Sequence, residues 1–168
     1  MKEIYLAGGC FWGTEHYFKQ INGVLSTETG FANGNTTNPT YEEVYTDTTD
    51  FAETVKVVYD EQRVSLMFLI DMFFYAIDPT QLNQQGHDKG TRYRTGVYYM
   101  DEKDREVIET VFQKKQKNYT KPIVTELEPL HNYFPASEEH QDYLDKHPDG
   151  YCHLPTELFR FVKEATVY

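Results

Sequence analysis

Residues 64–77 form the segment that most restricts how this chain can fold. They are apolar almost all round, and the segment ends at Asp78-Pro79. A helix with apolar residues on every side must be covered by other elements, so we expect this one to be buried against a sheet. Its longest uninterrupted apolar run that contains no tyrosine spans residues 66–70. That run is far shorter than the roughly 18 residues that a membrane span needs.

The rest of the chain alternates between strand and helix patterns. Strands are predicted at residues 2–8, 23–34, 54–59, 91–100 and 123–127, and helices at residues 11–21, 64–77 and 102–118, with a short helix from Ser137. This β-α-β-β-α-β-α-β-α order predicts an α+β two-layer sandwich, with helices packed on a mixed or antiparallel sheet as in a ferredoxin-like plait. No repeat or linker divides the chain, so residues 1–168 are expected to form one domain, with residues 148–168 as a C-terminal loop or tail. Within that tail, residues 157–165 are helix-like.

Charge and cysteine content argue against several classes of function. The 27 acidic and 16 basic residues give a net charge of −11. Nucleic acid and anionic membranes would be repelled, so neither is an expected partner. Two cysteines do not make a disulfide scaffold, and the apolar residues 4–7 are too few for a secretory signal. We therefore expect a cytoplasmic protein with reduced thiols.

The strongest local signal is a cysteine where a predicted strand meets a predicted helix. Residues 8–15 read Gly-Gly-Cys-Phe-Trp-Gly-Thr-Glu. Free backbone N–H groups and the helix dipole favour a thiolate there, so we expect a lowered pKa for Cys10. The neighbouring Phe11 and Trp12 favour a small apolar group, such as a methyl, over a charged substrate. A core cysteine at an ordinary strand–glycine–helix junction is the alternative interpretation.

Other chemistries remain open at this point. Cys152 lies between His147 and His153, so a Cys/His metal cluster is one alternative. A papain-like hydrolase with His140 or His16 as the base is another, because a cysteine at a helix start fits that class too. A non-enzymatic module whose aromatic residues hold a peptide is the third. The chain has no Gly-x-Gly-x-x-Gly, P-loop or His-Glu-x-x-His motif, so we expect no cofactor and no bound metal.

Residues 9–15 resemble the signature of the A-type peptide methionine sulfoxide reductases, in Gly-Cys-Phe-Trp-Gly followed by Glu15. The resemblance continues in order through residues 30–44, 52–55, 78–94, 134–141 and 150–152, and it covers about residues 3–153. Any one of these blocks is weak by itself. Their order along nearly the whole chain makes the resemblance specific.

The resemblance implies reduction of the S epimer of methionine sulfoxide, free or in proteins, to methionine. It implies that Cys10 is the nucleophile and that Glu53 is the acid that protonates the sulfoxide oxygen. Tyr41 and Tyr93 match the tyrosines that donate hydrogen bonds to this oxygen. The implied substrate-binding residues are Phe11 and Trp12, around the methyl group, and Asp88, near the substrate backbone.

The resemblance also implies a second step at sulfur. The first attack leaves Cys10 as a sulfenic acid, and condensation with Cys152 gives a disulfide that thioredoxin reduces. An inert Cys152, with an external thiol acting directly on the sulfenic acid, is the alternative. The expected protein is a monomeric enzyme that repairs oxidised proteins and needs no cofactor.

Three positions depart from the family pattern. Phe51 stands where a histidine is common, so a histidine there cannot be essential in this chain. Tyr45 stands where cysteine or serine is common, and Arg92 where glutamine is usual. We expect Arg92 to add a cation near the entrance of the site, and none of the three to touch the thiol, the acid or the donor tyrosines.

Overall fold

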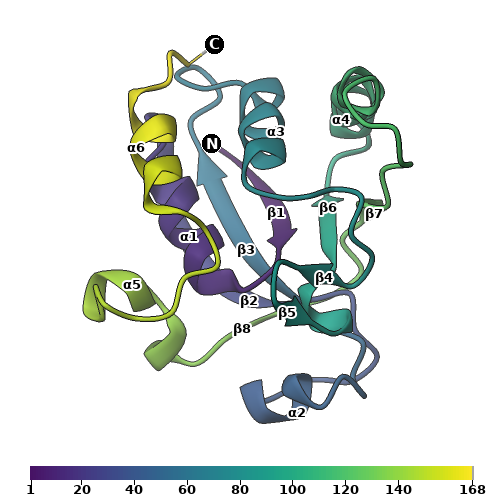
Figure 1. The fold of residues 1–168 in the computed structure, drawn as a ribbon, viewed down its shortest axis with the longest axis vertical. Coiled ribbons are helices and arrows are strands. Elements are labelled where there is room, and N and C mark those ends of the chain that lie inside the picture. Colours follow the sequence, from purple (N-terminus) through teal and green to yellow (C-terminus); the bar gives the residue numbers. More distant parts are fainter. Residues whose placement is uncertain (168) are drawn as a thin grey trace.

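The computed structural model describes residues 1–167, which fold around one six-stranded sheet of order β7-β6-β1-β3-β2-β8 (Figure 1). Its strands are β1 Lys2–Gly8, β2 Val24–Ala32, β3 Ala52–Tyr59, β6 Thr95–Tyr99, β7 Glu126–Pro129 and β8 Tyr133–Pro135. Neighbouring strands are antiparallel, except that β6 and β7 run parallel. A separate hairpin joins β4 Gln84–Gln85 to β5 Asp88–Lys89. The fold is therefore α+β with a mixed sheet, as predicted.

Helices pack beside this sheet and connect its strands. They are α1 Phe11–Lys19, α2 Tyr41–Tyr45, α3 Leu66–Tyr75, α4 Glu102–Gln116, α5 Tyr143–Lys146 and α6 Thr156–Glu164. Helix α6 lies beside α1, and α3 lies beside α4 (Figure 1). Helix α6 is the helix-like stretch noted in the sequence, and it packs against α1, the helix that begins after Cys10.

The apolar segment that restricted the fold is confirmed as a buried helix. In α3 only Met67, Asp71 and Tyr75 are not buried. The helix begins after Ser65, whose side chain accepts a hydrogen bond from the backbone N–H of Phe68. Its buried side chains share one core with those of β1, β3 and α1. The sheet and its helices therefore enclose a common apolar interior.

Element boundaries differ from the prediction where the backbone turns. The strand predicted at residues 91–100 begins at Thr95, because Thr91–Tyr93 is a 3₁₀ turn that follows Gly90 at φ 138°. The short helix predicted from Ser137 is two pieces, a 3₁₀ turn at Glu138–His140 and α5. Asp142 separates them in the left-handed region at φ 52°. Such backbone reversals leave little signal in apolar periodicity.

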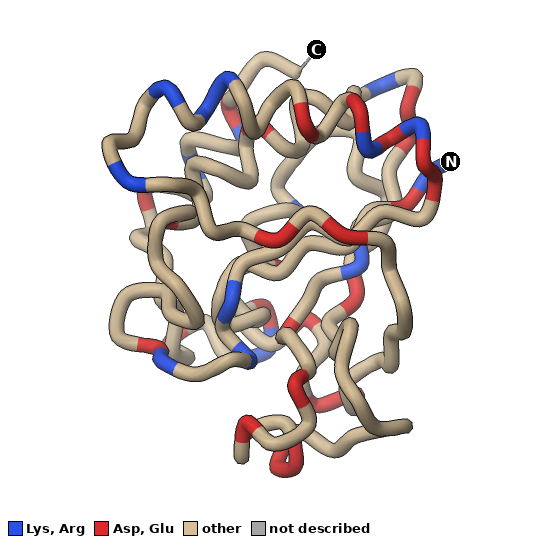
Figure 2. Tube along the Cα trace, turned by 90° about the vertical axis from the view of Figure 1, so that its right-hand side faces the viewer, with Lys and Arg blue, Asp and Glu red and all other residues tan. Residues whose placement is uncertain are grey.

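Acidic residues are spread over the whole trace in Figure 2. The lobe at the bottom of that view, around α2, carries acidic positions without basic ones. In sequence, residues 34–52 contain no Lys or Arg and four acids, Glu42, Glu43, Asp47 and Asp50. In the described part of the chain, no helix is both long and apolar enough to cross a membrane.

Candidate active site

Cys10 occupies the last position between β1 and α1, as the sequence predicted. It is the N-cap of α1, and its side chain makes no capping hydrogen bond. Gly9 turns the chain at φ 89°, a conformation that side chains rarely adopt. The hydroxyl of Thr14 donates to the carbonyls of Gly8 and Cys10, both at 3.2 Å, which fixes the turn from inside the helix. The thiol itself is buried, with 4% of the residue exposed.

Glu53 reaches the same place from β3. Its Oε1 accepts the backbone N–H of Phe11 at 3.2 Å, while its Oε2 is buried and has no hydrogen-bond partner among the described residues. Burial raises the pKa of Glu53 to about 8, against the opposing effects of the Phe11 N–H and the positive charge of Arg92. The carboxyl therefore holds its proton at neutral pH, and one of its oxygens is free to serve a ligand.

The expectation of a lowered pKa for Cys10 is wrong for this structure. Burial raises the pKa of the thiol well above its ordinary value, and the nearby Glu53 carboxyl adds to that effect. The backbone N–H of Trp12 favours the thiolate, as expected at a helix start, but it does not offset the loss of solvation. The unliganded site is therefore a thiol beside a carboxylic acid, so it holds two protons.

Tyr41 and Tyr93 lie around the same two groups. Tyr41 is the first residue of α2, and Tyr93 is the last residue of the Thr91–Tyr93 turn. Burial and the charge of Glu53 raise the pKa of both phenols, to about 12 for Tyr93, and a charge on Cys10 raises both further. Both hydroxyls therefore stay protonated, as hydrogen-bond donors must. The structure brings together these four residues from four separate segments.

An aromatic cluster adjoins these groups. The indole of Trp12 stacks on Tyr143 with ring centroids 3.8 Å apart, and its Nε1 donates to Nδ1 of His140 at 3.2 Å. His140 in turn stacks on Tyr41 at 4.4 Å. Phe11 is fully buried, whereas Trp12 is only half-buried. Trp12 therefore offers the accessible apolar face, and Tyr143 is a residue that the sequence analysis missed.

The two histidines considered as bases for a hydrolase are engaged elsewhere. His140 uses Nδ1 to accept from Trp12, and burial lowers its pKa, so it is neutral. His16 lies with its Nδ1 3.6 Å from Asp145 and its ring edge-on to Phe159. Neither histidine is therefore seen paired with Cys10, as the hydrolase alternative requires.

Cys152 lies against the first turn of α1. An ideal Cβ at Gly13 would be 3.1 Å from Cys152 Sγ, so the absence of a side chain at Gly13 makes room for this sulfur. Both cysteines are free thiols, and a charge on Cys152 acts on Cys10. Among residues 1–167, no three His, Cys, Asp or Glu side chains are arranged to hold a metal ion. The Cys/His cluster around Cys152 is therefore not supported.

Asp88 holds the segment that carries Cys152. Both of its carboxylate oxygens lie 2.9 Å from the hydroxyl of Tyr151, which donates to them. Asp88 follows the β4–β5 turn, and Tyr151 is the residue directly before Cys152. The charge of Asp88 also raises the pKa of Cys10. No role was predicted for Tyr151, because a single tyrosine among 14 carries no local signal.

Two of the three family departures touch each other and one of the two tyrosines expected to be donors. The guanidinium of Arg92 lies 4.1 Å from the ring centroid of Tyr45 and 4.3 Å from that of Tyr93. It also forms an ion pair with Asp47 at 2.5 Å. The expectation that these departures leave the donors untouched is therefore wrong. The third departure, Phe51, is buried and packs edge-on against Phe134.

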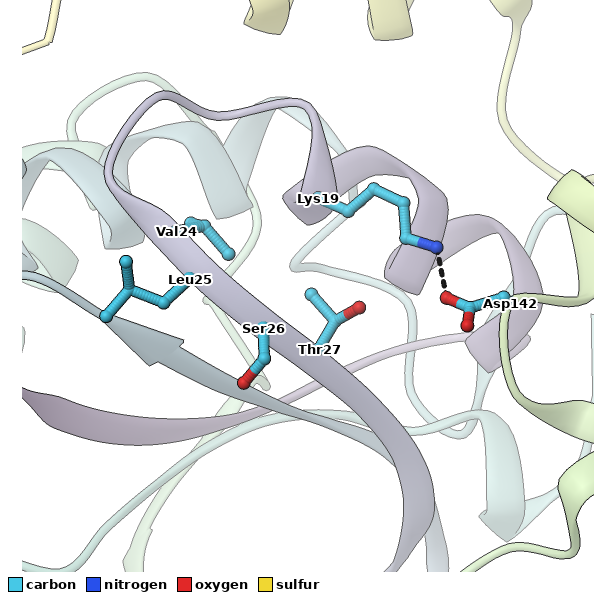
Figure 3. Close-up of a pocket in the computed structure, with 6 residues that line it drawn as sticks. All are labelled: Lys19, Val24, Leu25, Ser26, Thr27 and Asp142. Atoms are coloured by element: carbon cyan, nitrogen blue, oxygen red, sulfur yellow. Dashed lines mark hydrogen bonds and ion pairs between the residues drawn. The ribbon is translucent and has the colours of Figure 1, made fainter.

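A separate surface groove of about 370 Å³ lies away from these groups. Figure 3 shows its lining, which contains neither a cysteine nor an aromatic residue: Lys19, Val24, Leu25, Ser26, Thr27 and Asp142. At its rim Lys19 pairs with Asp142, so its one cation is already neutralised. The chemistry of this chain is therefore assigned to the Cys10 region and not to this groove.

The cysteine thiol lies beside a protonated carboxyl and two phenols on an α+β domain, an arrangement that fits an oxidoreductase acting on oxidised sulfur compounds. The family model for peptide methionine sulfoxide reductase matches residues 2–166. This chain belongs to that family, in its A type, and is an enzyme that reduces methionine sulfoxide.

Individual relatives agree with this assignment. A peptide methionine sulfoxide reductase MsrA of Clostridium acetobutylicum is 56% identical over 160 residues, covering 95% of this chain and 99% of the relative. The crystal structure of reduced Mxr1 from Saccharomyces cerevisiae is 38% identical, with a TM-score of 0.86, and covers 90% of this chain and 88% of that one. A structure of Mxr1 in complex with Trx2 is similar at a TM-score of 0.60 and 29% identity, over 84% of each chain.

Proposed function

We propose that this enzyme acts on the S epimer of methionine sulfoxide through a Cys10 sulfenic acid and a Cys10–Cys152 disulfide, with thioredoxin as the reductant. The observation that carries the proposal is the Glu53 carboxyl. It is protonated near neutral pH, one of its oxygens is held by the N–H of the residue after Cys10, and the other is free. An acid poised beside a sulfur nucleophile is what transfer of a sulfoxide oxygen requires.

In the proposed first step, the Cys10 sulfur attacks the sulfoxide sulfur while Glu53 gives its proton to the oxygen. Tyr41 and Tyr93 donate hydrogen bonds to that oxygen as charge develops on it. The oxygen then passes to Cys10, and the thiol proton returns to Glu53. Cysteine thiol and sulfoxide thus become sulfenic acid and thioether, with the cysteine sulfur oxidised by two electrons and the methionine sulfur reduced by two.

For substrate binding, we assign the methyl group to the face of Trp12 together with the buried ring of Phe11. A rigid aromatic face fixes which side of the sulfoxide meets Cys10, and hence which epimer reacts. Trp12 is fixed by its stack on Tyr143 and its hydrogen bond to His140. Asp88, engaged with Tyr151 in this structure, is assigned to the substrate backbone.

The proposed second step uses Cys152. Its position against Gly13, in the first turn of α1, keeps it next to the helix that begins after Cys10. Cys152 also lines a groove of about 380 Å³, together with residues that include His16, Leu144, Pro148, Gly150 and Phe159. A reductant thiol can approach a disulfide at Cys152 through this groove. Thioredoxin is proposed as that reductant because the related Mxr1 forms a complex with Trx2.

We further propose that residues 1–168 act as one catalytic domain whose core is a ferredoxin-like plait. The support is the chain order β1-α1-β2-β3-α3-β6, which holds once α2, the β4–β5 hairpin and the Thr91–Tyr93 turn are set aside as insertions, and the strand order β6-β1-β3-β2, in which all neighbours are antiparallel. Strands β7 and β8 extend this core at its two edges.

A thiol count before and after one equivalent of a methyl sulfoxide, without reductant, tests this function. We expect two free thiols to become none, with one equivalent of thioether formed. Cys10→Ser abolishes thioether formation, whereas Cys152→Ser still forms one equivalent and keeps a sulfenic acid on Cys10. If one thiol persists in the wild-type protein and no intramolecular disulfide forms, the role of Cys152 is wrong.

A further inference from the structure

The imidazole of His153 sits on the glycine-rich turn that carries Cys10. Its Nε2 lies 3.0 Å from the carbonyl oxygen of Gly8. An ideal Cβ at Gly9 would lie 3.1 Å from Nε2, and one at Gly13 would lie 3.1 Å from Nδ1. The ring therefore fills space that these glycines leave open. It anchors the residue directly after Cys152 to the loop of the other cysteine.

This contact determines which ring nitrogen carries the proton. A carbonyl oxygen can only accept a hydrogen bond, so Nε2 of His153 is the donor to Gly8. Nδ1 then carries the lone pair in the neutral ring, and burial lowers the pKa of His153, which keeps the ring neutral. Nδ1 is buried and has no hydrogen-bond partner among the described residues. A buried acceptor without a donor is costly and points to a function.

The sulfur of Cys152 and Nδ1 of His153 adjoin the same small space beside Gly13. The position of a Cβ at Gly13 is 3.1 Å from Cys152 Sγ and equally 3.1 Å from His153 Nδ1. In this structure the thiol donates to the carbonyl of Leu154 at 3.4 Å, a weak interaction for a weak donor. The Cys152 sulfur thus shares this space with an unpartnered basic nitrogen, and the thiol must lose its proton before the sulfur can attack.

We propose that Nδ1 of His153 is the general base that takes the thiol proton of Cys152 when Cys152 attacks the Cys10 sulfenic acid. This inference rests on the proposed function, in which Cys152 resolves that acid. It is needed because burial disfavours the thiolate of Cys152, so the thiol does not ionise readily by itself near neutral pH. The hydrogen bond to Gly8 holds the ring while Nδ1 acts.

The step balances without any further reactant. The sulfur of Cys152 forms a bond to the sulfur of Cys10, and the S–O bond of the sulfenic acid breaks. The proton taken by Nδ1 passes to the leaving hydroxide, which departs as water, and the imidazole returns to its neutral state. The sulfenic acid is the oxidant and the thiol the reductant, so both sulfurs end at the disulfide level.

Single-turnover kinetics separate this step from the first one. Reduced enzyme is mixed with excess methyl sulfoxide without a reductant, and thioether formation and thiol loss are followed by rapid quench. His153→Gln offers an amide N–H to Gly8 but no basic nitrogen. We expect it to form thioether at a rate within about twofold of wild type and to form the disulfide on the order of 10²-fold more slowly, the low end for a lost general base. A sulfenic acid probe then labels Cys10.

Two further proteins make the result decisive. His153→Ala is expected to show the same slow step and to recover in proportion to imidazole added to the buffer. His131→Gln, at an exposed histidine between β7 and β8, is the matched control and is expected to match wild type.

Disulfide formation at the wild-type rate in His153→Gln would overturn the role of the base and leave a purely anchoring histidine. Failure of added imidazole to speed the step in His153→Ala would also count against it. If the wild-type protein itself forms thioether but no disulfide, the proposed role of Cys152 fails instead. The two failures are therefore distinguishable.

Discussion

The guanidinium of Arg92 lies 4.1 Å from the ring centroid of Tyr45, so two positions where this chain departs from its family pattern are in direct contact. The same guanidinium lies 4.3 Å from the ring centroid of Tyr93 and forms an ion pair with Asp47. Gly90 permits this pairing, because a Cβ there would lie 2.5 Å from the Asp47 carboxylate. A fixed cation thus stands behind a donor tyrosine of the proposed site.

Arg92→Gln is expected to change the pH dependence of the first step. The cation of Arg92 lowers the pKa of Glu53, so its removal lets that pKa rise. The acid then stays protonated to higher pH, so the alkaline limb, where the rate of thioether formation falls, moves to higher pH. Arg92→Lys, which keeps the charge and loses the planar stack, is the control and is expected to move the limb less. A limb at the same pH in all three proteins would show that Arg92 does not act on Glu53.

Glu53→Gln tests the acid itself. An amide cannot deliver a proton to the sulfoxide oxygen, so thioether formation is expected to fall on the order of 10²–10⁴-fold. In the wild-type protein the rate of this step should decline as pH rises through about 8, the pKa of Glu53, because the acid form is lost. The residual rate of Glu53→Gln should lack that decline. An equal decline in both proteins would assign it to another group.

The same carboxyl makes stability depend on pH. Its pKa is 4.5 in an unfolded chain and about 8 when buried, so between these values the folded state keeps a proton that the unfolded state releases. Stability is therefore lost as pH rises from about 4.5 to about 8. Glu53→Gln removes this loss, so its melting temperature should exceed that of wild type more at pH 9 than at pH 5. Parallel melting curves would contradict the buried, protonated state.

His140 is expected to position Trp12 for substrate binding. His140→Phe keeps a ring in the stack but removes the acceptor for the indole N–H. A hydrogen bond has a net worth of about 1 kcal/mol, so KM should rise about fivefold while kcat changes little. Burial lowers the pKa of His140, so protonation should remove the same acceptor in wild type below pH 6.5. A KM that rises on acidification in wild type but not in His140→Phe would match this view, and identical profiles would refute it.

Glu15 should matter to stability more than to chemistry. Its buried carboxyl accepts from the backbone N–H of Asp142 at 2.8 Å and from the hydroxyl of Thr27 at 3.0 Å. It thereby ties α1 to β2 and to the left-handed turn before α5. Glu15→Ala leaves a backbone donor unpaired, so urea unfolding should show a loss of about 1–3 kcal/mol. Glu15→Gln keeps an acceptor and should lose less. A loss as large in Glu15→Gln would mean that the charge, and not the acceptor, is what matters.

Several features were predictable from the sequence because they are local. The apolar segment at residues 64–77 had to be a buried helix, and the glycines before Cys10 had to turn a strand into a helix. The order of strands and helices along the chain gave the α+β class. Ordered family motifs named Glu53, Tyr41 and Tyr93, and the structure places them around Cys10.

Other features were decided only when distant segments met. The backbone near Cys10 favours a thiolate, but burial of the thiol raises its pKa, and burial has no local signature. The hydrogen bond between Trp12 and His140 joins residues 128 positions apart in the sequence, and the contact between His153 and the Gly8 carbonyl joins residues 145 positions apart. Sequence by itself determined the backbone turn at Cys10, because a turn follows from neighbouring residues, and its ordered family motifs named the candidate reacting groups. Tertiary structure alone decided which protons those groups hold, because solvation and hydrogen-bond partners depend on what packs against them.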